Sequence, residues 1–296
     1  MPIDRHKALT AAPTSRVITW STRDVLLYHL SLGAGAGPAA DPELRLTYER
    51  GLQVLPTFAM VAGSGPSAGD TPFAADALPG IDIDPRAMLH AGQDLRVHRP
   101  LPPSGTATLT SRVSEVWDKG RAALVVLASE ATDSDGAALW TGTMRIWVRG
   151  EGGFGGEAGP EDTPTEPGRP ADLVVDTPTT ARQALLYRLN GDLNPLHADP
   201  EFARSVGFDR PVLHGLASYG LVGKALVDGL LDGDPTRLEE LSVRFAGALT
   251  PGETIRTSVW REEGGAPGTT RLLLRATCPE RDDAPVLTHA TATVRA

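Results

Sequence analysis

The C-terminal half of the chain combines one long apolar stretch with four later runs of strand-like pattern. From Leu213 to Leu231, small and apolar residues follow one another over the length of a single helix. The later runs are rich in β-branched or alternating apolar residues and cover residues 238–246, 254–261, 270–277 and 286–294. We therefore expect an α+β fold, in which a central helix is followed by a strongly antiparallel sheet.

The N-terminal half repeats the strand pattern but not the helix. Strand-like runs cover residues 95–99, 106–117, 121–132 and 139–148. Between Met60 and His90, glycine and proline recur, most densely over residues 63–70. Any helix there must be short or interrupted. We expect this thinner element to leave space beside the sheet.

The two halves are separated by a segment of low complexity. Residues 150–170 contain seven glycines, four prolines and five acidic residues. Such a composition cannot build a core, so the segment is expected to be a linker. This divides the chain into an N-terminal domain of residues 1–150, a linker of residues 151–170 and a C-terminal domain of residues 171–296.

Short segments recur at the same stage of each half, which favours an internal duplication. Residues 26–30 (LLYHL) correspond to residues 185–189 (LLYRL). Later in each half, residues 101–106 (LPPSGT) correspond to residues 249–254 (LTPGET). Chance similarity between leucine-rich helices and Pro-Gly turns is the alternative, but the shared order of the two matches favours duplication.

An acid and an imidazole lie five positions apart on one loop. A helical pattern over residues 181–189 leads to Asp192, and His197 follows after Asn194 and Pro195. Proline prevents a regular helix through the segment, so both groups are held on a stiff loop. Alone, Asp-x-Asn-Pro is also typical of an Asx turn that ends a helix. Together with His197, it predicts a site that transfers protons to and from a small molecule.

A second segment adds a hydrogen-bond donor to this site. His214 and Gly215 directly precede the long helical stretch, and a new helix is also expected after Asp199, with Pro200 at its first position. The Gly215 amide would then lie at a helix N-terminus, where backbone N–H groups have no partner within the helix. Such an amide can stabilise a developing oxyanion. His214 itself is expected to be structural and to bond the backbone at the helix start.

Composition excludes several classes of protein. The formal net charge is −9, which argues against nucleic-acid binding because phosphate contacts need a basic surface. No run of about eighteen apolar residues occurs, so no membrane-spanning helix is expected. The single Cys278 allows no internal disulfide, and no secretory signal is visible, so we expect a cytoplasmic protein. Three lysines among 28 basic residues, with many Ala, Gly and Pro, suggest a bacterial source.

The site loop resembles that of the hydratase 2 family, the MaoC-like (R)-specific enoyl-CoA hydratases in their two-hotdog form. The family pattern is an aromatic residue followed by Gly-Asp-x-Asn-Pro-hydrophobic-His, and it is satisfied by Tyr187, Gly191, Asp192, Asn194, Pro195, Leu196 and His197. Residues 89–93, 116–120, 213–216 and 243–246 match further family segments. The resemblance spans about residues 16–295.

The resemblance implies two hotdog folds, each a central helix wrapped by an antiparallel sheet, with the active site in the C-terminal one. It also implies that Asp192 and His197 form the catalytic dyad and that Asn194 orients groups beside them. The Gly215 amide would bind the thioester oxygen. Two such folds in one chain mimic the family's usual dimer, so either a monomer or a homodimer of such pairs is expected.

The resemblance further implies substrate contacts outside the loop. His90, Lys119 and Phe245 fall where the family contacts the CoA thioester. Ala91 departs from the pattern, because relatives commonly have glycine after that histidine, and its methyl group would narrow the approach of the ligand. Arg244, with Lys119 and other arginines, is a candidate for a basic rim that binds the CoA phosphates.

The reaction implied is the reversible addition of water to a trans-2-enoyl-CoA to give a (3R)-hydroxyacyl-CoA. One water held between Asp192 and His197 would deliver both the hydroxyl group and the proton in a syn addition. No cofactor is needed. A metal site of Asp192, His197 and His214 is conceivable, but hydration requires no metal, so none is expected. An acyl-CoA thioesterase and a non-catalytic acyl-CoA-binding subunit, the latter motivated by Ala91, are the alternatives.

Overall fold

A computed structural model describes residues 3–36, 41–66, 78–84, 87–160, 167–262 and 266–295. Its main feature is one ten-stranded sheet with the order β1-β3-β4-β5-β2-β7-β10-β9-β8-β6. All neighbouring strands are antiparallel. The N-terminal strands are β1 (Thr14–Trp20), β2 (Met88–Val97), β3 (Gly105–Asp118), β4 (Ala122–Thr132) and β5 (Ala138–Arg149). The C-terminal strands are β6 (Leu173–Pro178), β7 (Leu238–Phe245), β8 (Thr254–Arg261), β9 (Thr269–Cys278) and β10 (Ala284–Arg295).

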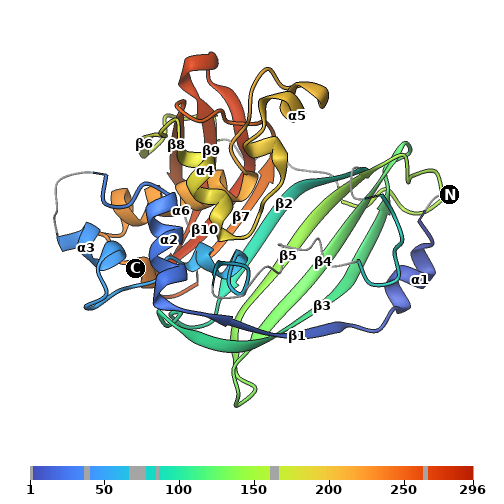
Figure 1. Cartoon of the computed structure of the whole chain (residues 1–296), viewed down its shortest axis with the longest axis horizontal. Helices are drawn as coiled ribbons and strands as arrows, with labels where there is room; N and C mark the ends of the chain where they lie inside the picture. The colour runs from blue at the N-terminus through green and yellow to red at the C-terminus, as the bar shows by residue number, and fades with distance from the viewer. Residues whose placement is uncertain are drawn as a thin grey trace.

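The two halves of the sheet have the same topology. From the outer edge to the centre, the order is β1-β3-β4-β5-β2 in one half and β6-β8-β9-β10-β7 in the other. Strands β2 and β7 pair at the centre, with Gly92 opposite Arg244, so the two halves form one continuous sheet (Figure 1). This repeated order agrees with the duplication inferred from the sequence.

Six α-helices pack around this sheet in the described part of the chain, the last of them against strands of the C-terminal half and the first against β3 of the N-terminal half. They are α1 (Arg5–Thr10), α2 (Thr22–Ser31), α3 (Asp41–Thr47), α4 (Gln183–Tyr187), α5 (Pro200–Ser205) and α6 (Gly215–Leu230). Single 3₁₀ turns are η1 (Pro56–Met60), η4 (Arg188–Asn190), η5 (Pro195–His197), η6 (Pro235–Arg237) and η7 (Pro279–Arg281). None of these described helices is long and apolar enough to cross a membrane.

The central helix α6 is nearly enclosed by the rest of the protein. All its residues from Ala217 to Val227 are buried, and it contacts η1, β6, β7, β8 and β10. In the N-terminal half, the 3₁₀ helix η1, five residues long, packs against α6. The predicted contrast between one long helix and one short element is therefore confirmed for the described residues; residues 67–77 of the glycine-rich segment lie outside them.

The helices that contain the recurring segments also occupy corresponding places in the two halves. Helix α2 contains residues 26–30 and helix α4, with η4, contains residues 185–189, so the recurring segments fold into equivalent elements that touch. The α2 N-terminus is closed by a capping box, in which Ser21 accepts from the Asp24 amide and Asp24 accepts from the Ser21 amide. The rings of Tyr28 and Tyr187 meet between the two helices, 6.1 Å apart.

Three expectations about the elements need correction. The edge strands β1 and β6 were missed, because alternate residues on an edge strand face solvent and the apolar signal is weak; Val17 on β1 is an example. Strand β2 begins at Met88 rather than Leu95, because a bulge between His90 and Gly92 interrupts its alternation.

The linker is not wholly outside the core. Phe154 packs against a second buried cluster that includes Val116 and Val125. The amides of Gly153 and Gly155 donate hydrogen bonds to the Asp118 carboxylate, at 2.9 and 2.8 Å. The start of this segment is therefore fastened to the β3–β4 hairpin, contrary to the expectation from its composition; residues 161–166 lie outside the described residues.

A close approach between α2 and α6 yields a stability prediction. A Cβ at Gly220 would lie 2.7 Å from the Tyr28 hydroxyl and 2.8 Å from Leu32 Cδ1. Overpacking of this kind costs about 1–3 kcal/mol, which exceeds the gain of about 1 kcal/mol in helix propensity. We expect Gly220→Ala to lower the free energy of unfolding in urea. The loss should shrink when Leu32→Val makes room, and an increase in stability from Gly220→Ala alone would contradict this packing.

Candidate active site

The loop of Asp192 and His197 begins at a position that only glycine can occupy. Gly191 follows η4 with φ of 114°, and a Cβ there would lie 2.2 Å from the Ser64 carbonyl oxygen. The turn after η1, which contains Ser64, and the end of η4 therefore touch through bare backbone. This contact fixes where the loop leaves the helix, and it joins the second half of the chain to the first.

Two Asx turns then shape the loop. The Asp192 carboxylate accepts a hydrogen bond from the Asn194 amide at 3.1 Å, and Asn194 Oδ1 accepts one from the Leu196 amide at 3.0 Å. Pro195 begins η5, which ends at His197. The predicted Asx turn is present, and together with the second turn it positions the side chains of Asp192 and His197 in one site.

His197 is held as a base by its backbone partner. The side chain is buried, and its Nδ1 lies 2.8 Å from the Val212 carbonyl oxygen. Because a carbonyl only accepts, Nδ1 carries the proton, and in the neutral ring Nε2 has a free lone pair. Burial lowers the pKa of His197, opposed by the bond to Val212 and by the charge of Asp192. The ring is therefore neutral, and able to accept a proton, at ordinary pH.

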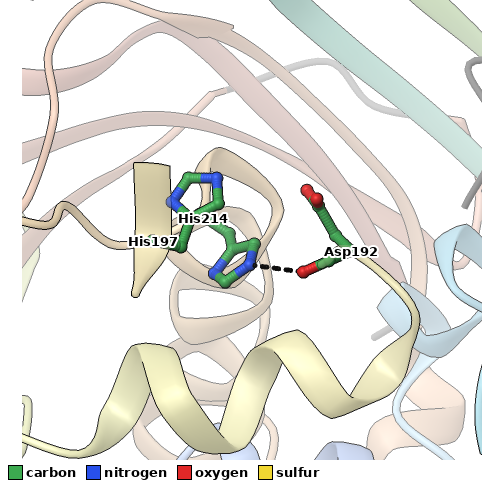
Figure 2. A group of neighbouring side chains, drawn as sticks. All are labelled: Asp192, His197 and His214. Atoms are coloured by element: carbon green, nitrogen blue, oxygen red, sulfur yellow. Dashed lines mark hydrogen bonds between the residues drawn. The ribbon is translucent and has the colours of Figure 1, made fainter. Parts of the chain in front are cut away.

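His214 lies against both members of the dyad (Figure 2). Its Nε2 lies 3.1 Å from the main-chain oxygen of Asp192, and its ring stacks on that of His197, with centroids 3.6 Å apart and planes 25° apart. Asp192, His197 and His214 each offer an atom within 4.8 Å of the others. A backbone bond at the helix start was expected of His214, but its contact with His197 was not.

This cluster has the composition of a metal site but not the geometry. Lone pairs of imidazole nitrogens lie in the ring plane, so a cation bound by both rings must lie near both planes. Two nearly parallel rings 3.6 Å apart do not allow this. In addition, His197 Nδ1 and His214 Nε2 face carbonyl oxygens and are protonated. The arrangement instead suits two neutral imidazoles beside one carboxylate.

The predicted oxyanion donor lies at the start of α6. Gly215 is exposed and is the first residue of the helix. The ring of Phe245 from β7 lies beside it, where a Cβ on Gly215 would meet the ring at 3.2 Å. On its other side, Phe245 meets the ring of His90 edge to face, with centroids 4.7 Å apart. Residues from both halves of the chain therefore converge at the helix N-terminus.

His90 is a neutral side chain at this junction. Its Nε2 lies 3.1 Å from the Gly92 carbonyl oxygen, so Nε2 carries the ring proton. Burial lowers the pKa of His90 to about 4, although Asp192 acts in the opposite direction. His90 is thus close enough to the dyad loop for the charge of Asp192 to affect its pKa, and its contact with the substrate stays a prediction.

A cavity of about 500 Å³ opens beside Asp192 and extends under the N-terminal sheet. Gly191, Asp192, Leu193 and Asn194 line one end, and Met60, Ala62 and Ser64 line the side next to η1. Its apolar walls come largely from the sheet and include Met88, Leu109, Leu127, Trp140, Met144 and Ile146. The space that the short first-half helix was expected to leave is therefore present and adjoins Asp192.

The remaining predicted residues lie at different distances from this centre. Ala91 is the bulged residue of β2, next to His90, and Arg244 is an exposed residue of β7 that pairs with Gly92. Lys119 lies in the β3–β4 hairpin, its amide bonded to the Ala122 carbonyl. It does not line the cavity in the described part of the chain. Ala91 therefore lies next to His90 and Arg244 on the strand beside it, whereas Lys119 lies in a separate hairpin; in the described part of the chain, none of the three lines the cavity.

Comparison with known proteins covers nearly the whole chain. Residues 18–150 match the family described as MFE-2 hydratase 2 N-terminal domain, and residues 162–273 match the MaoC like domain. The chain is 46% identical over 287 residues to the enoyl-CoA hydratase ChsH3 of Mycobacterium tuberculosis, covering 97% of both chains. It is 39% identical to the 3-hydroxyacyl-thioester dehydratase Y of the same organism, covering 90% of both.

The fold has equally close structural counterparts. A crystal structure of a MaoC-like dehydratase from Phytophthora capsici superimposes with a TM-score of 0.85, at 32% identity and 98% coverage of both chains. A Mycobacterium tuberculosis protein described as a double hotdog fold has a TM-score of 0.57 at 15% identity, which shows the fold alone. The predicted arrangement of two hotdog folds is confirmed.

The buried histidines predict how stability depends on pH. His29 on α2 is fully buried, with Nδ1 bonded to the Leu46 carbonyl and Nε2 accepting from the Leu55 amide. Burial lowers its pKa to about 4, and that of His214 to about 3. Because these rings charge more readily when unfolded, their stabilisation is complete above about pH 6.5 and is lost as pH falls toward 4.

We expect the free energy of unfolding in urea to fall between pH 7 and pH 5, by about 2 kcal/mol for a ring such as His29. The His29→Gln variant should lose that part of the pH dependence, although it is less stable at pH 7. A wild-type stability that is unchanged between these pH values would contradict neutral burial of these side chains.

Proposed function

Because the chain belongs to the hydratase 2 family of MaoC-like proteins, we propose that it catalyses the reversible hydration of trans-2-enoyl-CoA to (3R)-hydroxyacyl-CoA. The reverse direction is the dehydration of a 3-hydroxyacyl thioester. Relatives named enoyl-CoA hydratase and 3-hydroxyacyl-thioester dehydratase support both directions.

The observation that carries this proposal is the spacing of the dyad. A ring nitrogen of His197 and a carboxylate oxygen of Asp192 lie within 4.8 Å of each other. Two hydrogen bonds of about 2.7–3.2 Å meeting at one water oxygen span such a gap, so a single water can be held by both groups. Since His197 Nδ1 is bound to the Val212 carbonyl, the ring is fixed in the form whose other nitrogen accepts a proton.

The chemistry follows from these groups. The water oxygen attacks C3 of the enoyl thioester while the dyad takes one water proton, and C2 gains a proton from the dyad on the same face. The Gly215 N–H stabilises the negative charge that develops on the thioester oxygen. The dyad acts jointly, Asn194 holds the turn that presents Asp192, and no cofactor takes part in these steps.

The remaining site residues receive roles in substrate binding. His90 and Phe245 form the wall next to the thioester, and the methyl group of Ala91 narrows the space for the ligand beside that wall. Arg244 is an exposed cation beside β2, where it can meet the CoA phosphates. Lys119 contributes to CoA binding only if the nucleotide end of CoA extends over the β3–β4 hairpin.

We further propose a cytoplasmic protein that is either a monomer of two hotdogs or a homodimer. The pairing of β2 with β7 already joins two hotdogs within one chain, which supports a self-sufficient monomer. Mass measurement in solution distinguishes the two states.

Removal of either dyad group should abolish most of the activity. We expect Asp192→Asn and His197→Ala each to lower kcat for hydration by a factor on the order of 10² to 10⁴, the usual contribution of a positioned acid or base. The measurement is the loss of the conjugated absorbance of an enoyl-CoA. Wild-type rates in both variants would refute the assignment, and release of free thiol from a saturated acyl-CoA would indicate a thioesterase instead.

The cavity predicts which acyl groups are preferred. Because its apolar walls extend well beyond the dyad, medium, long or ring-bearing acyl groups gain burial that a four-carbon chain does not. We expect a higher kcat/KM for an enoyl-CoA of about ten carbons than for crotonyl-CoA. A clear preference for crotonyl-CoA would show that the cavity does not receive the acyl chain.

A further inference from the structure

His214 contacts both members of the dyad without sharing their chemistry. His214 is the residue directly before α6. Its Nε2 is hydrogen-bonded to the main-chain oxygen of Asp192, and its ring stacks on the ring of His197. Asp192 and His197 are otherwise fixed by separate bonds, through the Asn194 amide and the Val212 carbonyl. His214 is therefore the side chain that joins the two supports.

The ring remains neutral throughout the range in which the dyad can act. His214 is 2% exposed. Its burial, and to a smaller extent the nearby His197, lowers its pKa to about 3. The bond to the Asp192 carbonyl opposes this shift, and the charge of Arg188 adds to it. Tyr187 is the other aromatic neighbour, 4.9 Å away between centroids, and burial raises its pKa well above the ordinary value. Nε2 is thus a permanent donor.

Packing alone does not explain an imidazole at this position. With Nε2 protonated, Nδ1 is an acceptor, yet it is buried with no hydrogen-bond partner among the residues that the structure describes. An unpaired buried acceptor is destabilising, whereas a phenyl ring would fill similar space without that penalty. The benefit that offsets it must come from what only the imidazole supplies here, namely a donor to Asp192 on a flat ring against His197.

We infer that His214 is a positioning residue, which holds the Asp192 backbone with its N–H and shields the His197 ring with its face, so that one side chain sets the spacing of the dyad. The inference rests on the proposed hydration reaction. The two contacts of His214 can be removed one at a time by substitution. Phenylalanine retains a ring against His197 and lacks the donor. Glutamine can place a side-chain N–H near the position of Nε2 and lacks the ring.

The two substitutions should therefore change the kinetics of hydration in different ways. In His214→Phe, Asp192 loses its tether, and we expect kcat to fall about 10- to 100-fold with KM nearly unchanged, as for a small misplacement of a reacting group. The acidic limb of the pH profile of kcat/KM should stay in place. In His214→Gln, kcat should be higher than in His214→Phe. Water then reaches the His197 ring, its pKa rises, and the acidic limb moves to higher pH.

The matched control is His29→Gln, which removes another buried neutral histidine outside the site. It should lower stability and leave the acidic limb at its wild-type position. Equal losses of kcat in the two His214 variants with no movement of the limb would overturn the inference, as would wild-type behaviour in both. If the wild type hydrates no enoyl thioester, the proposed function is contradicted. The inference is then tested separately by the histidine proton resonances, where His214→Gln must raise the pKa of His197 and His214→Phe must not.

Discussion

The hydrogen bond from His197 Nδ1 to the Val212 carbonyl is the interaction on which the chemistry of this protein depends. It selects one tautomer, leaves the other ring nitrogen unprotonated, and ties η5 to the strand-like segment that leads into α6. Burial then keeps the ring neutral. Without this bond the ring could turn or exchange its proton between nitrogens, and the carboxylate of Asp192 would face a donor as often as an acceptor. A carboxylate and a neutral base can share one water; a carboxylate and an imidazolium would pair with each other instead.

In the proposed function, the two halves of the duplicated architecture contribute different parts of the site. The second half has the long central helix α6, whose N-terminus supplies Gly215, and the loop that supplies the dyad. Among the described residues of the first half, the short η1 packs against α6, and it also lines the apolar cavity. Because β2 and β7 pair at the centre of one sheet, the cavity wall and the catalytic loop belong to one rigid support. In the proposed function, this cavity receives the acyl chain of the substrate.

Much of this was predictable from the sequence, and the failures have physical causes. The strands β3 to β5 and β7 to β10 follow from alternation, and α6 from its length and apolar character. The edge strands β1 and β6 were missed because one of their faces is solvated, and the start of β2 because a bulge changes its phase. The Asp192 and His197 loop was identified from spacing and turn chemistry. The stacking of His214 on His197 was not, because it depends on where the start of α6 meets the loop, a tertiary contact with no local signal. Lys119 lies in the β3–β4 hairpin, and its expected contact with CoA stays a prediction, because a local sequence match does not show which part of a ligand a residue meets.

Hydration in deuterated water tests the central claim most directly. If one water is held between Asp192 and His197 on a single face of the substrate, the hydroxyl group at C3 and the deuterium at C2 must be added to the same face. We expect a single (3R) product with syn-related hydroxyl and deuterium. A product of anti addition, or a mixture of both diastereomers formed at the first turnover, would contradict a shared water and therefore the dyad itself.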